Sequence, residues 1–237
     1  MPFFHKSHSS LLFFLVLPLL CSCSKEEKPE LITTDEIHLL RAGDILFQDL
    51  DCGDICEAIE RVTHGYADAD ISHMGVISSI DENGIKVFES YSEGVVETPL
   101  EEFLDRSEDK EGRPKVMVGR LKPHWNPYIK SFLKGVDEWK GKPYDPTYTM
   151  DNSSFYCAEV IYLLFNEKGH SNNPFIPQPM TFKDPDSGEF FPVWVRHYED
   201  LGIPIPEGEQ GLNPAAMSRS NALNIIYLFG LPEGLDI

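Results

Sequence analysis

Basic residues are scarce in this sequence of 237 residues, where 20 Lys and Arg stand against 39 Asp and Glu and the formal net charge is −19. A protein of this charge is repelled by the phosphates of nucleic acids and by the headgroups of anionic lipids. We therefore expect no nucleic-acid partner and no electrostatic adhesion to a membrane. The same acidity is compatible with an amine-bearing substrate.

Cysteine is also scarce, with five residues in the chain: Cys21, Cys23, Cys52, Cys56 and Cys157. Cys52 and Cys56 could form a disulfide in an oxidising compartment, although a spacing of four on a helix is near the limit of disulfide geometry. A zinc site needs more ligands than this region offers, so we expect neither a metal nor another cofactor. Cys157 has no evident partner, and such a cysteine in an exported protein is a candidate reactive thiol.

The chain lacks an apolar run long enough for a comfortable membrane span. The run over residues 11–20 is too short for that purpose, follows a weakly positive head with Lys6, and precedes small residues and cysteines. This layout is typical of a secretory signal peptide, which we predict over residues 1–22.

The end of this segment, Leu20-Cys21-Ser22-Cys23, resembles a bacterial lipobox, in which a cysteine is acylated and becomes the new N-terminus. The resemblance implies lipidation at Cys23. Cys21 is a competing site, and an ordinary cleaved signal is the alternative. A lipobox implies a bacterial cell-envelope protein whose N-terminal lipid holds it to the membrane, on the periplasmic side or at the cell surface. We expect residues 23–33 to form a tether and residues 34–237 to form a single domain.

Helix and strand patterns are mixed along the chain without a repeat, which predicts an α+β fold. The stretch "ISHMGVISSIDENGIKVFESY" predicts a hairpin with a three-residue loop at residues 82–84. Thr98 is predicted to be the N-cap of a short helix, with Pro99 at its first position. Residues 172–211 are rich in Pro, Gly and aromatic residues and are predicted to be a long ordered loop region.

Cys157 is predicted to lie in the first turn of an apolar helix, because Asn152, Ser153 and Ser154 before it are good helix caps. Unsatisfied N–H groups and the helix dipole favour a thiolate there, and the same N–H groups can act as an oxyanion hole. A nucleophilic cysteine needs a base, and His73, at the head of a predicted strand, is the best candidate. The alternative is that both residues are buried packing groups.

Six motifs follow one another in an order that resembles a known family: "GDILFQ", "SHMGVI", "VFES", "TPLEEFL", "GKPYD" and "FYCAEVIY". They resemble the permuted papain-like amidases of the YaeF/YiiX type, which are relatives of NlpC-type cell-wall endopeptidases. In the permuted order the histidine strand precedes the cysteine helix. The resemblance implies a circularly permuted papain-like (NlpC-type) fold, with an antiparallel sheet, packed helices and a catalytic cysteine at a helix N-terminus.

The resemblance implies that Cys157 is the nucleophile, that His73 is the base and that Glu89 in "VFES" orients the imidazole. The predicted hairpin loop points elsewhere, because it places Glu93 opposite His73 and leaves Glu89 four positions away along the strand. A bulge could close that gap, so both glutamates stand as candidates and Glu89 is preferred. By the same resemblance Tyr144 in "GKPYD" helps to line the oxyanion region, although it could instead be a packing aromatic.

Ser72 and Tyr156, which directly precede His73 and Cys157, are the expected substrate contacts. Ala158 stands where relatives commonly have a serine after the cysteine. If that serine hydroxyl takes part in catalysis, its absence here argues against activity.

These residues predict a lipid-anchored cysteine amidase or peptidase that acts on amide bonds, with cell-wall (peptidoglycan) peptides as the expected substrate. A lipid acyl hydrolase or acyltransferase with the same three residues is one alternative. A surface lipoprotein that binds a ligand without catalysis is another.

Overall fold

The structure is a computed structural model, and it describes residues 1, 28–150, 153–166 and 173–237. The predicted signal peptide, the lipobox cysteines Cys21 and Cys23, and the predicted cap Asn152 lie outside these residues. In the described ranges no helix is both long enough and apolar enough to cross a membrane.

A seven-stranded sheet forms the centre of the described structure, with the strand order β1-β9-β6-β2-β3-β4-β5. Its neighbours are antiparallel except β1 and β9, which run parallel. A separate two-stranded sheet is formed by β7 and β8. The strands are β1 (Glu30–Leu31), β2 (Ile45–Gln48), β3 (His73–Asp81), β4 (Gly84–Tyr91), β5 (Gly94–Pro99), β6 (Val116–Leu121), β7 (Gln178–Pro179), β8 (Gln210–Gly211) and β9 (Leu223–Leu228).

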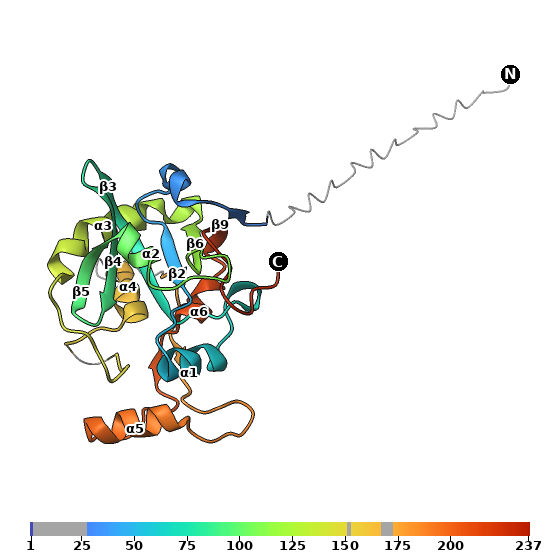
Figure 1. Cartoon of the computed structure of the whole chain (residues 1–237). Coiled ribbons are helices and arrows are strands. Elements are labelled where there is room, and N and C mark those ends of the chain that lie inside the picture. Colours follow the sequence, from blue (N-terminus) through green and yellow to red (C-terminus); the bar gives the residue numbers. More distant parts are fainter. Residues whose placement is uncertain (2–27, 151–152, 167–172) are drawn as a thin grey trace.

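Helices pack on both faces of this sheet, and short 3-10 turns connect several of the elements (Figure 1). The α-helices are α1 (Asp54–Val62), α2 (Leu100–Leu104), α3 (Asn126–Trp139), α4 (Cys157–Asn166), α5 (Pro192–Leu201) and α6 (Pro214–Ser218). The 3-10 helices are η1 (Thr34–Leu39), η2 (Tyr66–Asp68) and η3 (Pro123–Trp125).

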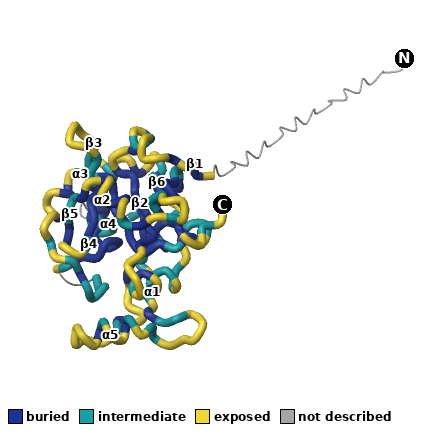
Figure 2. The backbone as a smooth tube through the Cα atoms, in the orientation of Figure 1, coloured by how far each residue is buried: buried dark blue, intermediate teal, exposed yellow. Residues whose placement is uncertain are grey.

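The strands alternate between two apolar clusters because successive side chains point to opposite faces. Phe47 and Val76 lie in the cluster with α3 and α4, whereas the adjacent positions Leu46 and Ile77 lie in the cluster with α2. Figure 2 shows the result as a buried interior with exposed turns and loops around it. The α+β fold predicted from the sequence is therefore the fold observed.

The folded part begins before residue 34, so the predicted tether over residues 23–33 is too long. Glu30 and Leu31 pair with Tyr227 and Leu228 of β9, and Ile32 is buried. An edge strand forms here because β9 would otherwise leave one row of backbone groups unpaired.

Residues 192–201 form a helix, α5, where the sequence predicted only an ordered loop. Pro192 occupies the first turn and Gly202 ends the helix with a left-handed backbone, at φ 69°. Proline at the start and glycine just past the end are a recognised helix signature, and it was overlooked in this aromatic-rich segment. Trp194 and Tyr198 pack with Ala58 of α1 in a third apolar cluster, which lies beyond α1 from the main sheet (Figure 1).

Candidate active site

Cys157 is the first residue of α4, in the first helical turn as predicted. The carbonyl of Tyr156 accepts a hydrogen bond from the Val160 N–H at 3.1 Å, so Tyr156 occupies the N-cap position. Ser153 and Ser154 are therefore not the N-cap of α4, from which the backbone bridge between Tyr144 and Phe155 separates them. Cys157 forms no disulfide, and the residue is 7% exposed.

His73 is the first residue of β3 and lies in contact with Cys157. Its Nε2–H donates to Glu89 Oε2 at 2.6 Å, and the imidazole also forms a hydrogen bond with the Cys157 thiol. Since Nε2 is bonded to the Glu89 carboxylate, Nδ1 is the ring nitrogen that faces the Cys157 thiol. Burial lowers the pKa of His73, but hydrogen bonds with Cys157 and Glu89 outweigh it and raise the pKa to about 9.

Glu89 reaches His73 because the hairpin register differs from the predicted one in two places. Asp81 pairs with Gly84, so the loop contains two residues rather than three, and Ser78 forms a bulge between the pairs of Ser79 and Ile77. Each change moves β4 by one position, so Ile77 lies opposite Val87 rather than opposite Glu89. Glu89 is therefore two positions closer to His73 than in the predicted hairpin, one from the shorter loop and one from the bulge.

Glu93, the alternative partner of His73, lies in the turn between β4 and β5 and is exposed. The argument from the predicted loop was wrong because the loop has two residues instead of three and because β3 has a bulge at Ser78.

Arg106 and Thr98 hold the Glu89 carboxylate from its other side. Arg106 donates to both carboxylate oxygens at 2.7 Å, and the Thr98 hydroxyl donates to Oε1. Thr98 thus lies at the end of β5 and is not the N-cap of α2, which is Pro99. Burial raises the pKa of Glu89, but hydrogen bonds from His73 and Arg106 outweigh it and lower the pKa to about 2. The sequence analysis did not identify Arg106. The only available signal was indirect: a buried glutamate needs a cation as its partner, and Arg106 is that cation.

Aromatic rings enclose this polar group. Tyr91 and Phe103 lie with their ring centroids 5.3 Å and 5.8 Å from that of His73. The Arg106 guanidinium stacks over the Tyr91 ring at 4.1 Å from its centroid. These contacts exclude water and restrict the imidazole to one orientation.

A cavity of about 1210 Å³ opens beside Cys157 and His73. Tyr144 lines it, and its hydroxyl donates to that of Tyr148 at 3.2 Å. Ser72 and Tyr156 line it as well, but their oxygens accept internal hydrogen bonds from Leu50 N at 3.0 Å and Leu212 N at 2.9 Å. Both predicted substrate contacts are thus also structural groups.

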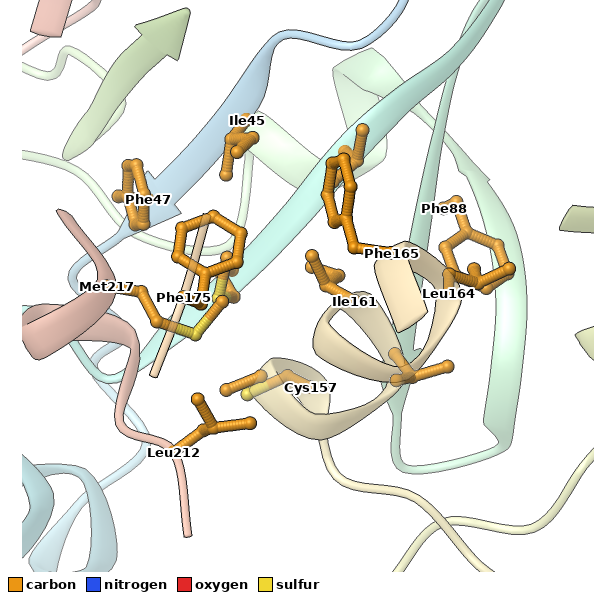
Figure 3. Close-up of a cluster of buried hydrophobic side chains, with 14 of the residues drawn as sticks. Ile45, Phe47, Phe88, Cys157, Ile161, Leu164, Phe165, Phe175, Leu212 and Met217 are labelled. Carbon is orange, nitrogen blue, oxygen red and sulfur yellow. The ribbon is translucent and has the colours of Figure 1, made fainter. Parts of the chain in front are cut away.

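The walls of the cavity are largely apolar. Figure 3 shows Cys157 on the first turn of α4 with Leu212 near its sulfur and with Met217 and Phe175 in the same cluster. No Asp or Glu is among the described residues that line the cavity, and its ionisable groups other than the site residues include His64, His124 and Arg219. Ala158 is fully buried and does not line the cavity, so a hydroxyl at this position would face the core.

Cys52 and Cys56 form a disulfide around the start of α1, and both line the same cavity. In the described part of the chain, no group of three or more His, Cys, Asp and Glu residues is arranged to hold a metal ion.

The family model described as "Permuted papain-like amidase enzyme, YaeF/YiiX, C92 family" matches residues 39–227. The chain belongs to this family. Among solved structures, it is similar to the crystal structure of the metalloprotein yiiX from Escherichia coli O157:H7, with a TM-score of 0.64 and 23% sequence identity over 81% of this chain and 98% of that one. No match was found among curated proteins.

Membership of the permuted papain-like amidase family settles two of the sequence predictions. The fold is the permuted papain-like fold, in which the histidine strand β3 precedes the cysteine helix α4. The chain is a cysteine hydrolase of the amidase or peptidase class, rather than a lipoprotein that binds without catalysis.

Proposed function

We propose that Cys157, His73 and Glu89 form the catalytic triad of this amidase. The observation that carries the proposal is the continuous chain of contacts from the Cys157 thiol through the His73 imidazole to the Glu89 carboxylate, at the wall of a large cavity. A nucleophile, a base and a group that orients the base are the parts that acyl transfer requires.

In the proposed reaction His73 takes the thiol proton, and Cys157 Sγ forms a bond to the carbonyl carbon of the amide. The carbonyl electron pair moves to the oxygen, which the N–H groups of the first turn of α4 stabilise, in a region that the Tyr144 side chain helps to line. His73 then gives its proton to the leaving amine, and water, activated by His73, hydrolyses the thioester.

The cavity favours an amide whose acyl group is apolar, such as an N-acyl amino acid or an N-acylated lipid. Its walls include aromatic and aliphatic side chains, and such surfaces bind hydrocarbon through area removed from water. The described lining offers no carboxylate for an amine-bearing acyl group, so the acidity of the chain does not extend into the cavity.

Cell-wall peptides are the second candidate substrate, and Arg219 and His124 at the cavity favour them. These groups could bind the carboxylates of peptidoglycan stem peptides.

We also propose that the protein works in the bacterial cell envelope, anchored through a lipid on Cys23. The lipobox-like sequence supports this location, and so does the disulfide between Cys52 and Cys56, since disulfides persist mainly in oxidising compartments. The terminal lipid would hold the cavity near acylated substrates without a basic surface patch.

The test is hydrolysis by the full chain, purified in detergent, of N-acyl amino acid amides with acyl chains of two to sixteen carbons and of peptidoglycan fragments. We expect kcat/KM to rise with chain length and to fall by at least about 10³-fold in Cys157→Ala. Turnover of the peptidoglycan fragments alone would replace the first substrate class with the second. Turnover of neither, or full activity in Cys157→Ala, would contradict the proposed function.

A further inference from the structure

Tyr148 has a left-handed backbone, with φ 53°, which is uncommon for a residue with a bulky side chain. The Asp145 carboxylate fixes this backbone, because it accepts hydrogen bonds from Thr147 N at 2.8 Å and Thr149 N at 3.0 Å. Strained backbone of this kind persists where the surroundings determine it, and it concentrates at functional sites.

Helix α5 braces the same loop from outside. Its Tyr198 hydroxyl donates to the Thr147 carbonyl at 2.9 Å, and His197 Nε2 donates to the Pro146 carbonyl at 2.7 Å. The Tyr148 ring packs between Trp194 and Tyr156, with centroid distances of 5.4 Å and 5.7 Å. The side chain is therefore held in one place, on the wall of the cavity that contains Cys157 and His73.

The Tyr148 hydroxyl has an unused proton. It accepts the hydrogen bond from Tyr144, and among the described residues no acceptor for its own proton is found. Burial raises the pKa of Tyr148 to about 12, so the hydroxyl is a neutral donor at neutral pH. Both tyrosines are close enough to Cys157 for its charge to act on them.

We propose that Tyr148 is a further catalytic residue, whose hydroxyl donates a hydrogen bond to the oxyanion of the tetrahedral intermediate on Cys157. The hydrogen bond from Tyr144 strengthens Tyr148 as a donor, because a hydroxyl that accepts a hydrogen bond donates a stronger one. Tyr148 keeps its proton throughout. The carbonyl electron pair moves to the oxygen as the S–C bond forms, and the Tyr148 hydroxyl stabilises the resulting negative charge by a hydrogen bond. The role rests on the proposed function of Cys157 as nucleophile.

The test uses two probes of the full chain, a fatty aldehyde of eight to twelve carbons and iodoacetamide. The aldehyde adds to Cys157 as a hemithioacetal: the S–C bond forms, the carbonyl electron pair moves to the oxygen in the oxyanion position, and the thiol proton moves to His73. Iodoacetamide alkylates the thiol, losing iodide, without forming an oxyanion. Tyr148→Phe retains the ring and its packing and removes only the hydroxyl. Tyr66→Phe is the matched control, because Tyr66 does not line the cavity.

We expect Tyr148→Phe to lower kcat by about 10²- to 10³-fold with little change in KM, and to weaken aldehyde binding similarly, since one oxyanion donor is lost. The iodoacetamide rate should stay within about twofold of the wild type, and Tyr66→Phe should match the wild type in both assays. Unchanged aldehyde binding in Tyr148→Phe would overturn the proposal. A parallel loss of iodoacetamide reactivity would also overturn it, because the hydroxyl would then support the thiol. A wild-type protein that reacts with neither probe would overturn the proposed function together with this role.

Discussion

The Arg106 guanidinium holds both oxygens of the Glu89 carboxylate, from Nη1 to Oε2 and from Nη2 to Oε1, each at 2.7 Å. The side chain of Glu89 is 0% exposed and that of Arg106 is 13% exposed, so the pair lies almost wholly out of water. A bidentate pair of this kind fixes the plane of the carboxylate. The plane of the carboxylate in turn fixes the direction of the bond to His73.

Arg106→Gln should lower both stability and activity. Removing one partner of a buried pair typically costs about 3–5 kcal/mol of unfolding free energy, because the other charge is left uncompensated. The pKa of Glu89 should rise, so the acid limb of the kcat/KM profile should move to higher pH. Arg106→Lys keeps the positive charge but cannot donate two parallel hydrogen bonds to the carboxylate. It should therefore lower stability and activity less than Arg106→Gln does.

The control for Arg106 is Arg113→Gln, which removes a more exposed guanidinium that pairs with Asp109. The measurements are the free energy of unfolding in urea and the pH dependence of kcat/KM for each variant. An Arg106→Gln protein with the stability and acid limb of Arg113→Gln would show that the clamp on Glu89 is dispensable.

The His73–Glu89 pair should contribute stability mainly between about pH 4.5 and 6.5. The pKa of Glu89 is lowered from 4.5 to about 2, so its contribution is present above 4.5 and is lost as the pH falls through 2. The pKa of His73 is raised from 6.5 to about 9, so its contribution is present below 6.5 and is lost as the pH rises through 9.

Unfolding free energies of the wild type and of His73→Gln/Glu89→Gln, measured from pH 2 to pH 9.5, check this window. The difference between the two proteins should be largest near pH 5–6 and should shrink at both ends. A difference that does not vary with pH would mean that the two groups titrate alike in the folded and unfolded states.

Glu60 on α1 should destabilise the protein at alkaline pH. Burial raises its pKa to about 8, and its Oε1 has no hydrogen-bond partner among the described residues. The raised pKa means that folding favours the protonated acid, so stability is lost as the pH rises from 4.5 through 8. Glu60→Gln should therefore raise the Tm at pH 8.5 and leave it nearly unchanged at pH 4. An equal Tm shift at the two pH values would contradict this reading of Glu60.

The sequence predicted the parts of the site that depend on local order. Cys157 was placed in the first turn of an apolar helix from the capping residues before it, and this position is correct although the N-cap is Tyr156. His73 was placed at a strand start because apolar strand residues follow it. The order of the histidine strand and the cysteine helix also depends on sequence alone. These features are local, and the fold preserves them.

The sequence could not predict the parts that depend on tertiary pairing. The bulge at Ser78, which brings Glu89 to His73, is specified by how β3 packs against its neighbours. Arg106 follows a short helix and looks like a surface cation until α2 packs over the sheet. The role of Thr98 was mistaken because a threonine before a proline and a helix fits an N-cap, while its hydroxyl is taken by Glu89.

The most direct test of the account is the rate at which iodoacetamide alkylates Cys157 from pH 5 to pH 9, in the full chain with the Cys52–Cys56 disulfide intact. We predict a rate at pH 6–7 well above that of a model thiol, because His73 stabilises the thiolate, and a fall to model-thiol behaviour in His73→Ala. The same low rate in the wild type as in His73→Ala would contradict the claim that His73 and Glu89 activate Cys157 as a nucleophile.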